Sequence, residues 1–243
     1  MDALNEAYRR IRDILASDIE PLESVQLVET YRRFLRPEKV RVVLLAESHV
    51  FTSDEDRKIV IPPISELPGY PTQYARFVYC LGYGERLLTN DRGHPRGDGT
   101  PQFWKILFSC ANSICTAADF APILGKTAPQ QRLMNKVKLL RDLNSQGVWL
   151  VDTSIVALYR EGNKITNMFA ALQESWRSYT RQVVISSKPD HVICIGKGVA
   201  SVVGDDLEPH FGVRFSTIPQ PNAFLSSEEH MANYRRYGSI CRG

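Results

Sequence analysis

The sequence predicts an α/β fold, a three-layer α/β/α sandwich with a central, mainly parallel four-stranded sheet. Short apolar runs rich in β-branched residues alternate with longer segments whose apolar residues recur at helical spacing. Such alternation is typical of parallel sheets that helices cover on both faces. The 243 residues, 43% of them hydrophobic, suffice for one sizeable core. The strands are expected at 41–45, 147–151, 191–195 and 214–218.

The N-terminal part of the chain predicts two helices. Apolar residues recur at helical spacing over residues 2–34, and the pattern breaks near Pro21. We expect these helices to form a cap, residues 1–38, on a single domain that spans residues 1–243.

The first strand is followed by a polar stretch, 47–58, that predicts a loop. Loops at the carboxyl ends of parallel strands are where α/β proteins place ligands, so this loop is a candidate site. Residues 59–99 are rich in Pro, Gly and Tyr, with the clearest loop at 92–97. Helices are expected, in chain order, at 101–113, 131–144, 165–182, directly after Lys197 and at 228–237.

Composition limits the class of protein. A net charge of +3 is compatible with a nucleic-acid partner but does not demand one. No run approaches the roughly 18 apolar residues of a membrane span, and the N-terminus lacks a signal-peptide pattern. The five cysteines form no C-x-x-C pair, which favours reduced thiols over disulfides. We therefore expect a cytoplasmic monomer with no membrane association.

Four segments at strand ends resemble, in order and spacing, the motifs of the uracil-DNA glycosylase superfamily. Val42 to His49 is similar to a strand followed by G-Q-D-P-Y, or by G-E-x-P-G in the iron-sulfur branch. Gly147 to Thr153 is similar to G-V-L-L-L-N-T, and Val192 to Ala200 to a strand and glycine turn ending W-G-x-x-A. Ile218-Pro219-Gln220-Pro221 is similar to H-P-S-P. The resemblance covers residues 40–235.

This resemblance implies an enzyme of base excision repair. Such an enzyme flips uracil out of DNA, single- or double-stranded, and hydrolyses its N-glycosidic bond to leave an abasic site. Glu47 falls on the acidic position of the iron-sulfur branch, and Ser48 on the aspartate of the common motif. A carboxylate near the anomeric carbon stabilises the positive charge that develops on the sugar and orients water. We expect this role of Glu47, with Ser48 binding the same water or capping a turn.

The departing base needs a hydrogen-bond donor, which the family supplies with a histidine. Ile218 stands at that position and has no donor. The candidates to replace the histidine are backbone N–H groups of residues 218–223 and the side chains of His49, Gln220 and Asn222. A second interpretation is that catalysis has been lost and that the protein only binds uracil or an abasic site in DNA.

The family stacks a phenylalanine on the flipped base. Tyr79 aligns best with it, Phe77 and Tyr83 are rivals, and any of the three is alternatively a core residue. Asp152 takes the place of the asparagine that reads the pyrimidine edge. An ionised Asp152 only accepts hydrogen bonds and suits a base with two donors, such as cytosine, whereas a carboxyl kept protonated by burial imitates asparagine. The structural alternative is that Asp152 caps the turn after its strand.

DNA contacts are implied for the segment that follows the last strand. The resemblance assigns them to Pro219, Pro221 and an apolar wedge, Ala223-Phe224-Leu225, that fills the gap left by the flipped nucleotide. Alternatively, Phe224 and Leu225 begin the last helix, with Ser226 or Ser227 as its N-cap. Lys197, at a glycine turn before a helix, is a candidate phosphate contact.

No metal or cofactor is expected. The iron-sulfur branch needs four cysteines that begin with an early C-x-x-C, whereas the first cysteine here is Cys80. His94, His191, His210 and His230 show no spacing typical of metal ligands. A third interpretation is an α/β enzyme that acts on a free nucleoside or another small molecule, which would need neither the wedge nor DNA affinity.

Overall fold

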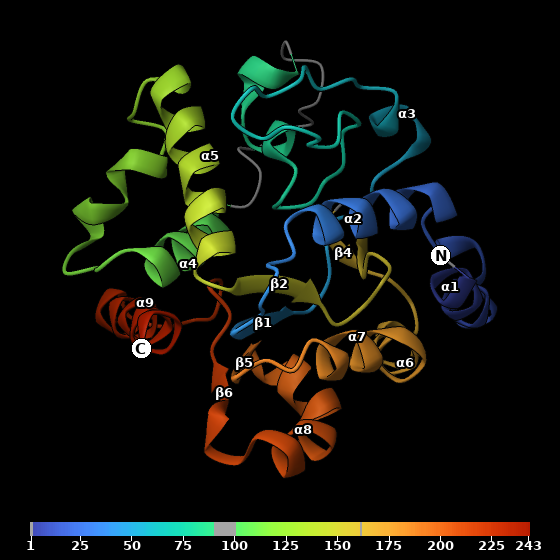
Figure 1. Cartoon of the computed structure of the whole chain (residues 1–243). Helices are drawn as coiled ribbons and strands as arrows, with labels where there is room; N and C mark the ends of the chain where they lie inside the picture. The colour runs from blue at the N-terminus through green and yellow to red at the C-terminus, as the bar shows by residue number, and fades with distance from the viewer. Residues whose placement is uncertain (1, 90–100, 161) are drawn as a thin grey trace.

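Figure 1 shows the computed structural model of the chain, which describes residues 2–89, 101–160 and 162–243. A four-stranded sheet in the order β2-β1-β5-β6 forms its centre, and every pairing in it is parallel. The strands are β1 (Val42–Ala46), β2 (Val148–Asp152), β5 (His191–Ile195) and β6 (Phe215–Ile218). The fold class is confirmed, and each expected strand is present to within one residue. The loop expected at 92–97, including His94, lies outside the described residues.

Helices cover both faces of the sheet. In Figure 1, one side carries α4 (Pro101–Ala111), α5 (Pro129–Ser145) and α9 (Ser227–Arg242), and the other side carries α6 (Met168–Ser175), α7 (Arg181–Ser186) and α8 (Lys197–Phe211). The central strands β1 and β5 are therefore apolar and buried along almost their whole length. This arrangement gives the three layers that the sequence predicts.

The two expected N-terminal helices are α1 (Asp2–Leu15) and α2 (Leu22–Phe34), and Pro21 lies directly before α2. The apolar face of α1 packs against α6. The two helices form a second, smaller core with the segment that follows β2; its members include Leu4, Ile11, Ile155, Val156 and Leu172. The helix α2 contributes Val25 to this second core and Val28 and Tyr31 to the main core.

The last helix, α9, extends past the expected 228–237 to Arg242, and two other segments differ in kind from the expectation. The helix expected at 165–182 begins at Met168, because Asn167 has a left-handed backbone with φ of 58°. It continues through a π-helical turn, Trp176–Thr180, into α7. The stretch 47–58 contains a short helix, α3 (Asp54–Arg57), because Ser53 caps it by accepting a 3.1 Å hydrogen bond from the N–H of Asp56.

A short hairpin of β3 (Tyr159–Arg160) and β4 (Asn163–Lys164) has no counterpart among the expected elements. Strands of two residues are too short to show an alternating pattern of apolar and polar residues. The hairpin follows β2 and carries Tyr159 toward the loop after β1, where the side chain of Glu47 lies.

The carboxyl ends of the four strands meet at one edge of the sheet. The register pairs Ala46 with Asp152 and Ile195 with Ile218. The loops that begin at 47, 153, 196 and 219 therefore leave the same edge, which is where open α/β sheets bind ligands. Among the described residues, no helix combines the length and the apolar character that crossing a membrane requires.

Candidate functional site

A cavity of about 330 Å³ opens at the carboxyl edge of the sheet, and we call it the outer cavity. Its walls come from the loops after β1 and β6, the first turn of α4 and the β3–β4 hairpin. Its lining residues are Glu47, Ser48, Val50, Gln102, Phe103, Tyr159, Ile195, Gln220, Pro221 and Asn222. The structure thus brings five residues predicted from the sequence, Glu47, Ser48, Gln220, Pro221 and Asn222, to one cavity.

Glu47 is half-buried on the wall of the outer cavity. The hydroxyl of Tyr159 donates a 2.9 Å hydrogen bond to its Oε2. Burial and the nearby Glu47 carboxylate raise the pKa of Tyr159 to about 12, so the phenol keeps its proton. A Cβ atom at Gly198 would lie 3.6 Å from Oε1 of Glu47, which places the carboxylate over the first turn of α8. The dipole of a helix stabilises negative charge at that end.

The turn between β5 and α8 fits closely against the loop after β6. Gly196 has φ of +102°, and a Cβ atom there would lie 2.5 Å from Cγ of Gln220. The N–H of Gly196 donates a 2.7 Å hydrogen bond to the carbonyl of Ile218. A glycine is needed here for both reasons, and it lets Gln220 reach the outer cavity.

A second, inner cavity of about 30 Å³ adjoins the outer one, with Ser48, Val50 and Phe103 lining both. Its deeper walls include His49, Phe77 and Asp152. A volume of this size has room for about one or two water-sized groups. Asp152 therefore lies behind the outer cavity rather than on its wall.

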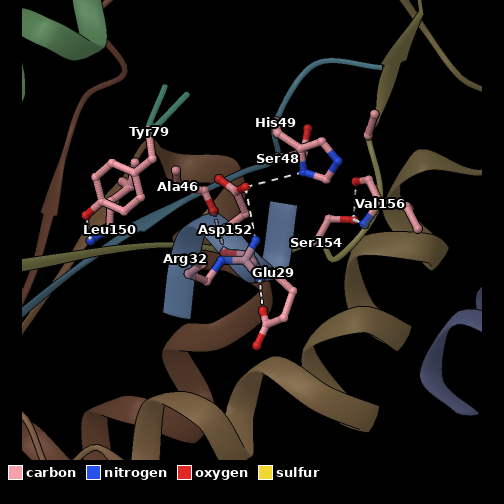
Figure 2. Close-up of polar contacts among 12 residues, drawn as sticks. Glu29, Arg32, Ala46, Ser48, His49, Tyr79, Leu150, Asp152, Ser154 and Val156 are labelled. Atoms are coloured by element: carbon pink, nitrogen blue, oxygen red, sulfur yellow. Dashed lines mark hydrogen bonds and ion pairs between the residues drawn. The ribbon is translucent and has the colours of Figure 1, made fainter. Parts of the chain in front are cut away.

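Asp152 belongs to a buried network of charged side chains (Figure 2). Its Oδ2 lies 3.3 Å from Nη2 of Arg32 and 3.4 Å from Nδ1 of His49. The other ring nitrogen of His49, Nε2, lies 2.6 Å from Oε1 of Glu20, and Arg32 Nη1 lies 2.6 Å from Oε2 of Glu29. Figure 2 shows the contacts of Asp152 with His49 and Arg32 ending on the same carboxylate oxygen.

Burial lowers the pKa of His49, but Glu20 and Asp152 outweigh burial and raise it from 6.5 to about 9. This pKa favours the protonated, imidazolium form of His49 at neutral pH. Its Nε2 is hydrogen-bonded to Glu20, and the residue lines the inner cavity and not the outer one, so His49 is not placed to donate to a ligand in the outer cavity. Among the candidates to replace the family's histidine, Gln220 and Asn222 remain on the cavity wall.

The three aromatic candidates, Tyr79, Tyr83 and Phe77, occupy different positions relative to the two cavities. The hydroxyl of Tyr79 accepts a 2.7 Å hydrogen bond from the N–H of Leu150 in the edge strand β2, and Tyr79 lines neither cavity. Tyr83 packs its ring against Tyr74 and is also outside both cavities. Phe77 lies on the wall of the inner cavity and packs edge-on against His49. Of the three aromatic candidates, Phe77, rather than the better-aligned Tyr79, is therefore the one that lies at the site.

Ile218 lies in the core and not at the site. It is fully buried, pairs with Ile195 in the sheet, and lines neither cavity. Pro219, which follows it, is half-buried and also outside both cavities. Of the segment that follows β6, Gln220, Pro221 and Asn222 line the outer cavity.

The loop after β6 ends in an exposed aromatic residue. Phe224 is fully exposed, whereas Ala223 and Leu225 on either side are half-buried. Ser226 is the N-cap of α9, since its Oγ accepts a 3.2 Å hydrogen bond from the N–H of Glu229. Phe224 therefore precedes the helix and does not begin it. Lys197 is exposed as the first residue of α8.

Several residues at the site have no signal in the sequence. Tyr159 comes from a hairpin too short to predict, and Phe103 comes from a helix whose apolar residues look like ordinary core positions. Glu20 and Arg32 lie in the N-terminal segment, far from the strand ends along the chain. Only the fold brings them to Asp152 and His49.

Among the described residues, no group of three or more His, Cys, Asp or Glu side chains is placed to hold a metal ion. The site is thus built from carboxylates, amides, hydroxyls and aromatic rings around two adjoining cavities. No known family model, curated protein or solved structure shows a significant match to this chain.

Proposed function

We propose that the protein binds DNA with one nucleotide rotated into the outer cavity and hydrolyses the N-glycosidic bond of that nucleotide, with uracil as the base. The observation that carries the proposal is the position of the Glu47 carboxylate on the wall of a 330 Å³ cavity that the turn of Gln220 to Asn222 also lines. Cavities of this volume hold small ligands. A base must leave the stack and enter such a pocket before its bond to the sugar is cut.

In the proposed reaction, water adds to the anomeric carbon of the sugar. The carbon–nitrogen bond breaks with its electron pair on the base, and the proton lost by water passes to Glu47. Positive charge develops on the sugar during this step, and the Glu47 carboxylate stabilises it. The bond from Tyr159 holds that carboxylate in place, and the Ser48 hydroxyl, on the same wall, is suited to bind the water.

The departing base carries negative charge, which a fixed hydrogen-bond donor stabilises. The side-chain amides of Gln220 and Asn222 are the donors proposed here, because both line the outer cavity. Ile218 is buried in the core, and His49 lines the inner cavity and not the outer one. Removal of one such donor costs roughly a hundredfold to a thousandfold in rate, so the proposed reaction depends on these two amides.

The exposed ring of Phe224 supports a DNA substrate. It lies two residues after Asn222, which lines the outer cavity, and nothing in the described chain covers it. Apolar side chains in this position serve as wedges that hold a kinked, unstacked base step open. Lys197 at the start of α8 is suited to contact a phosphate. A free nucleoside would use neither group.

One observation favours a second candidate function, a protein that binds uracil or an abasic site in DNA without turnover. Ile218 has no hydrogen-bond donor on its side chain, and it lies in the core rather than at the cavity. Such a protein would keep the cavity and Phe224 but would not depend on Glu47.

Single-turnover cleavage tests the proposal. Oligonucleotides with one uracil, cytosine or hypoxanthine are incubated with excess protein. One portion is treated with alkali, which cuts the strand at abasic sites and so reveals cleavage. A second portion is examined by gel-shift, which measures DNA binding. We expect cleavage at uracil, and Glu47→Gln to slow it by about 100-fold or more with DNA affinity unchanged. Glu55→Gln is the matched control, because Glu55 is an exposed carboxylate in the same loop region.

Unchanged cleavage by Glu47→Gln would overturn the proposed mechanism. Uracil-dependent retention on the gel without cleavage supports the binding function instead. Absence of both signals overturns the DNA proposal and supports a small-molecule substrate, which a DNA titration against salt would confirm by showing no affinity.

A further inference from the structure

Charged side chains form a buried row, in which negative and positive groups alternate, on the deep wall of the inner cavity and behind it. Its members, in spatial order, are Glu20, His49, Asp152, Arg32, Glu29 and Arg33. Three carboxylates thus face three cationic groups when His49 carries a proton. All of these side chains except Arg33 are almost fully buried.

The row needs a charged histidine. Glu20 and His49 have no exposed side-chain surface, and Oε1 of Glu20 lies 2.6 Å from both Nε2 of His49 and the N–H of Ala157. A buried carboxylate without a cationic partner is strongly destabilising. A neutral His49 would leave Glu20 with no cation beside it and Asp152 with Arg32 alone.

The same row connects the segments that build the outer cavity. His49 directly follows Glu47 and Ser48 in the chain, and Asp152 ends β2. Ala157, whose N–H is bound by Glu20, lies two residues before Tyr159. Glu20 therefore ties together the loop that carries Glu47 and the loop that carries its partner Tyr159.

We propose that Glu20 and His49 are positioning residues, which fix the Glu47 loop and the Tyr159 loop relative to each other by burying a charged imidazole between two carboxylates. The N-terminal segment then contributes to the functional site, in addition to forming a cap on the domain. The effect on turnover rests on the proposed glycosidic reaction, whereas the charge on His49 does not.

The groups that face His49 define its expected titration. Glu20 faces it from the connection between α1 and α2, and Asp152 faces it from β2 with Arg32 of α2 behind. Arg76 lies on the wall of the inner cavity and is paired with Asp56, and Phe77 packs edge-on against the ring. Two carboxylates in direct contact outweigh the more distant arginines, so the proton is retained through neutral pH.

Nitrogen-15 NMR of the imidazole rings tests the charge without any assay of activity. We expect His49 to keep both ring protons at pH 8 and to lose one as the pH rises past about 9. His191 serves as an internal control, because burial and the nearby Arg236 and Arg214 lower its pKa below 6.5. A His49 ring that is neutral at pH 7 would overturn the proposal.

Single-turnover cleavage across pH 6–10 tests the positioning role. We expect His49→Gln and Glu20→Gln to slow cleavage by about 10- to 100-fold at pH 7.5, because small displacements of a catalytic group have effects of that size. DNA affinity should stay within about threefold, since neither residue lines the outer cavity. The wild-type rate should fall past pH 9 more steeply than that of His49→Gln.

His191→Gln is the matched control variant, because His191 lies at the opposite, amino end of β5. It should keep the wild-type rate and pH profile. Wild-type cleavage together with an unaltered rate in both His49→Gln and Glu20→Gln overturns the positioning role. No cleavage by the wild type overturns the proposed function alone, and the NMR titration then decides the charge on His49.

Discussion

The hydroxyl of Tyr159 donates a 2.9 Å hydrogen bond to Oε2 of Glu47, and so joins the hairpin after β2 to the loop after β1. The proposed catalytic carboxylate is thus held from one side by a neutral phenol, which orients it without neutralising its charge. On the other side lies the first turn of α8. Hydrogen bonds to an ionised group are stronger than neutral ones, so this contact is a main determinant of the position of Glu47.

Tyr159→Phe should therefore reduce the single-turnover rate by about tenfold, because one hydrogen bond to a charged group is lost while the ring stays in place. DNA affinity should be unchanged. The measurement is the rate of cleavage with excess protein, and Tyr83→Phe is the control, since Tyr83 lines neither cavity. An equal rate in wild type and Tyr159→Phe would show that Glu47 is positioned by other contacts.

Phe224→Ala should weaken DNA binding by about tenfold or more and leave the free energy of unfolding unchanged. The reason is that the ring is fully exposed and packs against nothing in the described chain. Fluorescence anisotropy with uracil-containing DNA measures the affinity. Phe169→Ala removes a half-exposed phenylalanine from α6 and should have no effect on DNA affinity. If both variants bind DNA like the wild type, Phe224 is not a wedge.

The pH dependence of stability follows from His49. Its folded-state pKa of about 9 exceeds the ordinary value of 6.5, so the folded protein binds the proton more tightly. The resulting stabilisation is fully present below pH 6.5 and is lost as the pH rises to about 9, a total of roughly 3 kcal/mol. Urea unfolding between pH 6 and 9.5 should show this decline in the wild type. In His49→Gln the decline should be absent or much smaller.

Asp152→Asn should shift base choice toward uracil. Two cationic groups, Arg32 and His49, contact Oδ2 of Asp152, which favours the interpretation of this residue as an ionised acceptor. An asparagine adds a donor on the wall of the inner cavity, where it is able to bind a carbonyl of uracil that enters from the outer cavity. The ratio of uracil to cytosine binding should rise by about tenfold. The free energy of unfolding should fall, because Arg32 and His49 lose a charged partner. If the ratio of uracil to cytosine binding does not change, Asp152 takes no part in base recognition.

The sequence predicts the sheet well because its strands are short, β-branched and buried on both faces. The same argument places Glu47, Ser48 and Gln220 together, since the carboxyl ends of parallel strands share an edge. It does not separate Phe77 from Tyr79, because the two residues lie in an irregular segment without periodicity. Nor does it reveal that Glu20 and Arg32 contact His49 and Asp152, because those contacts depend on how α2 packs beside β2.

The last prediction concerns Gly196, where the backbone and the neighbouring side chain both require a glycine. A Cβ atom there would lie 2.5 Å from Cγ of Gln220, and φ of +102° is unfavourable for any other residue. Gly196→Ala should lower the free energy of unfolding by about 2 kcal/mol or more and displace Gln220 from the outer cavity, which slows cleavage. The control is Gly204→Ala in α8, where a Cβ atom meets nothing within 4 Å. That change should stabilise the helix by about 0.5–1 kcal/mol.

Urea unfolding of both variants measures the effects. If Gly196→Ala is as stable as Gly204→Ala, the turn at 196 has enough freedom to move away from Gln220, and the close fit between the two loops does not hold the site.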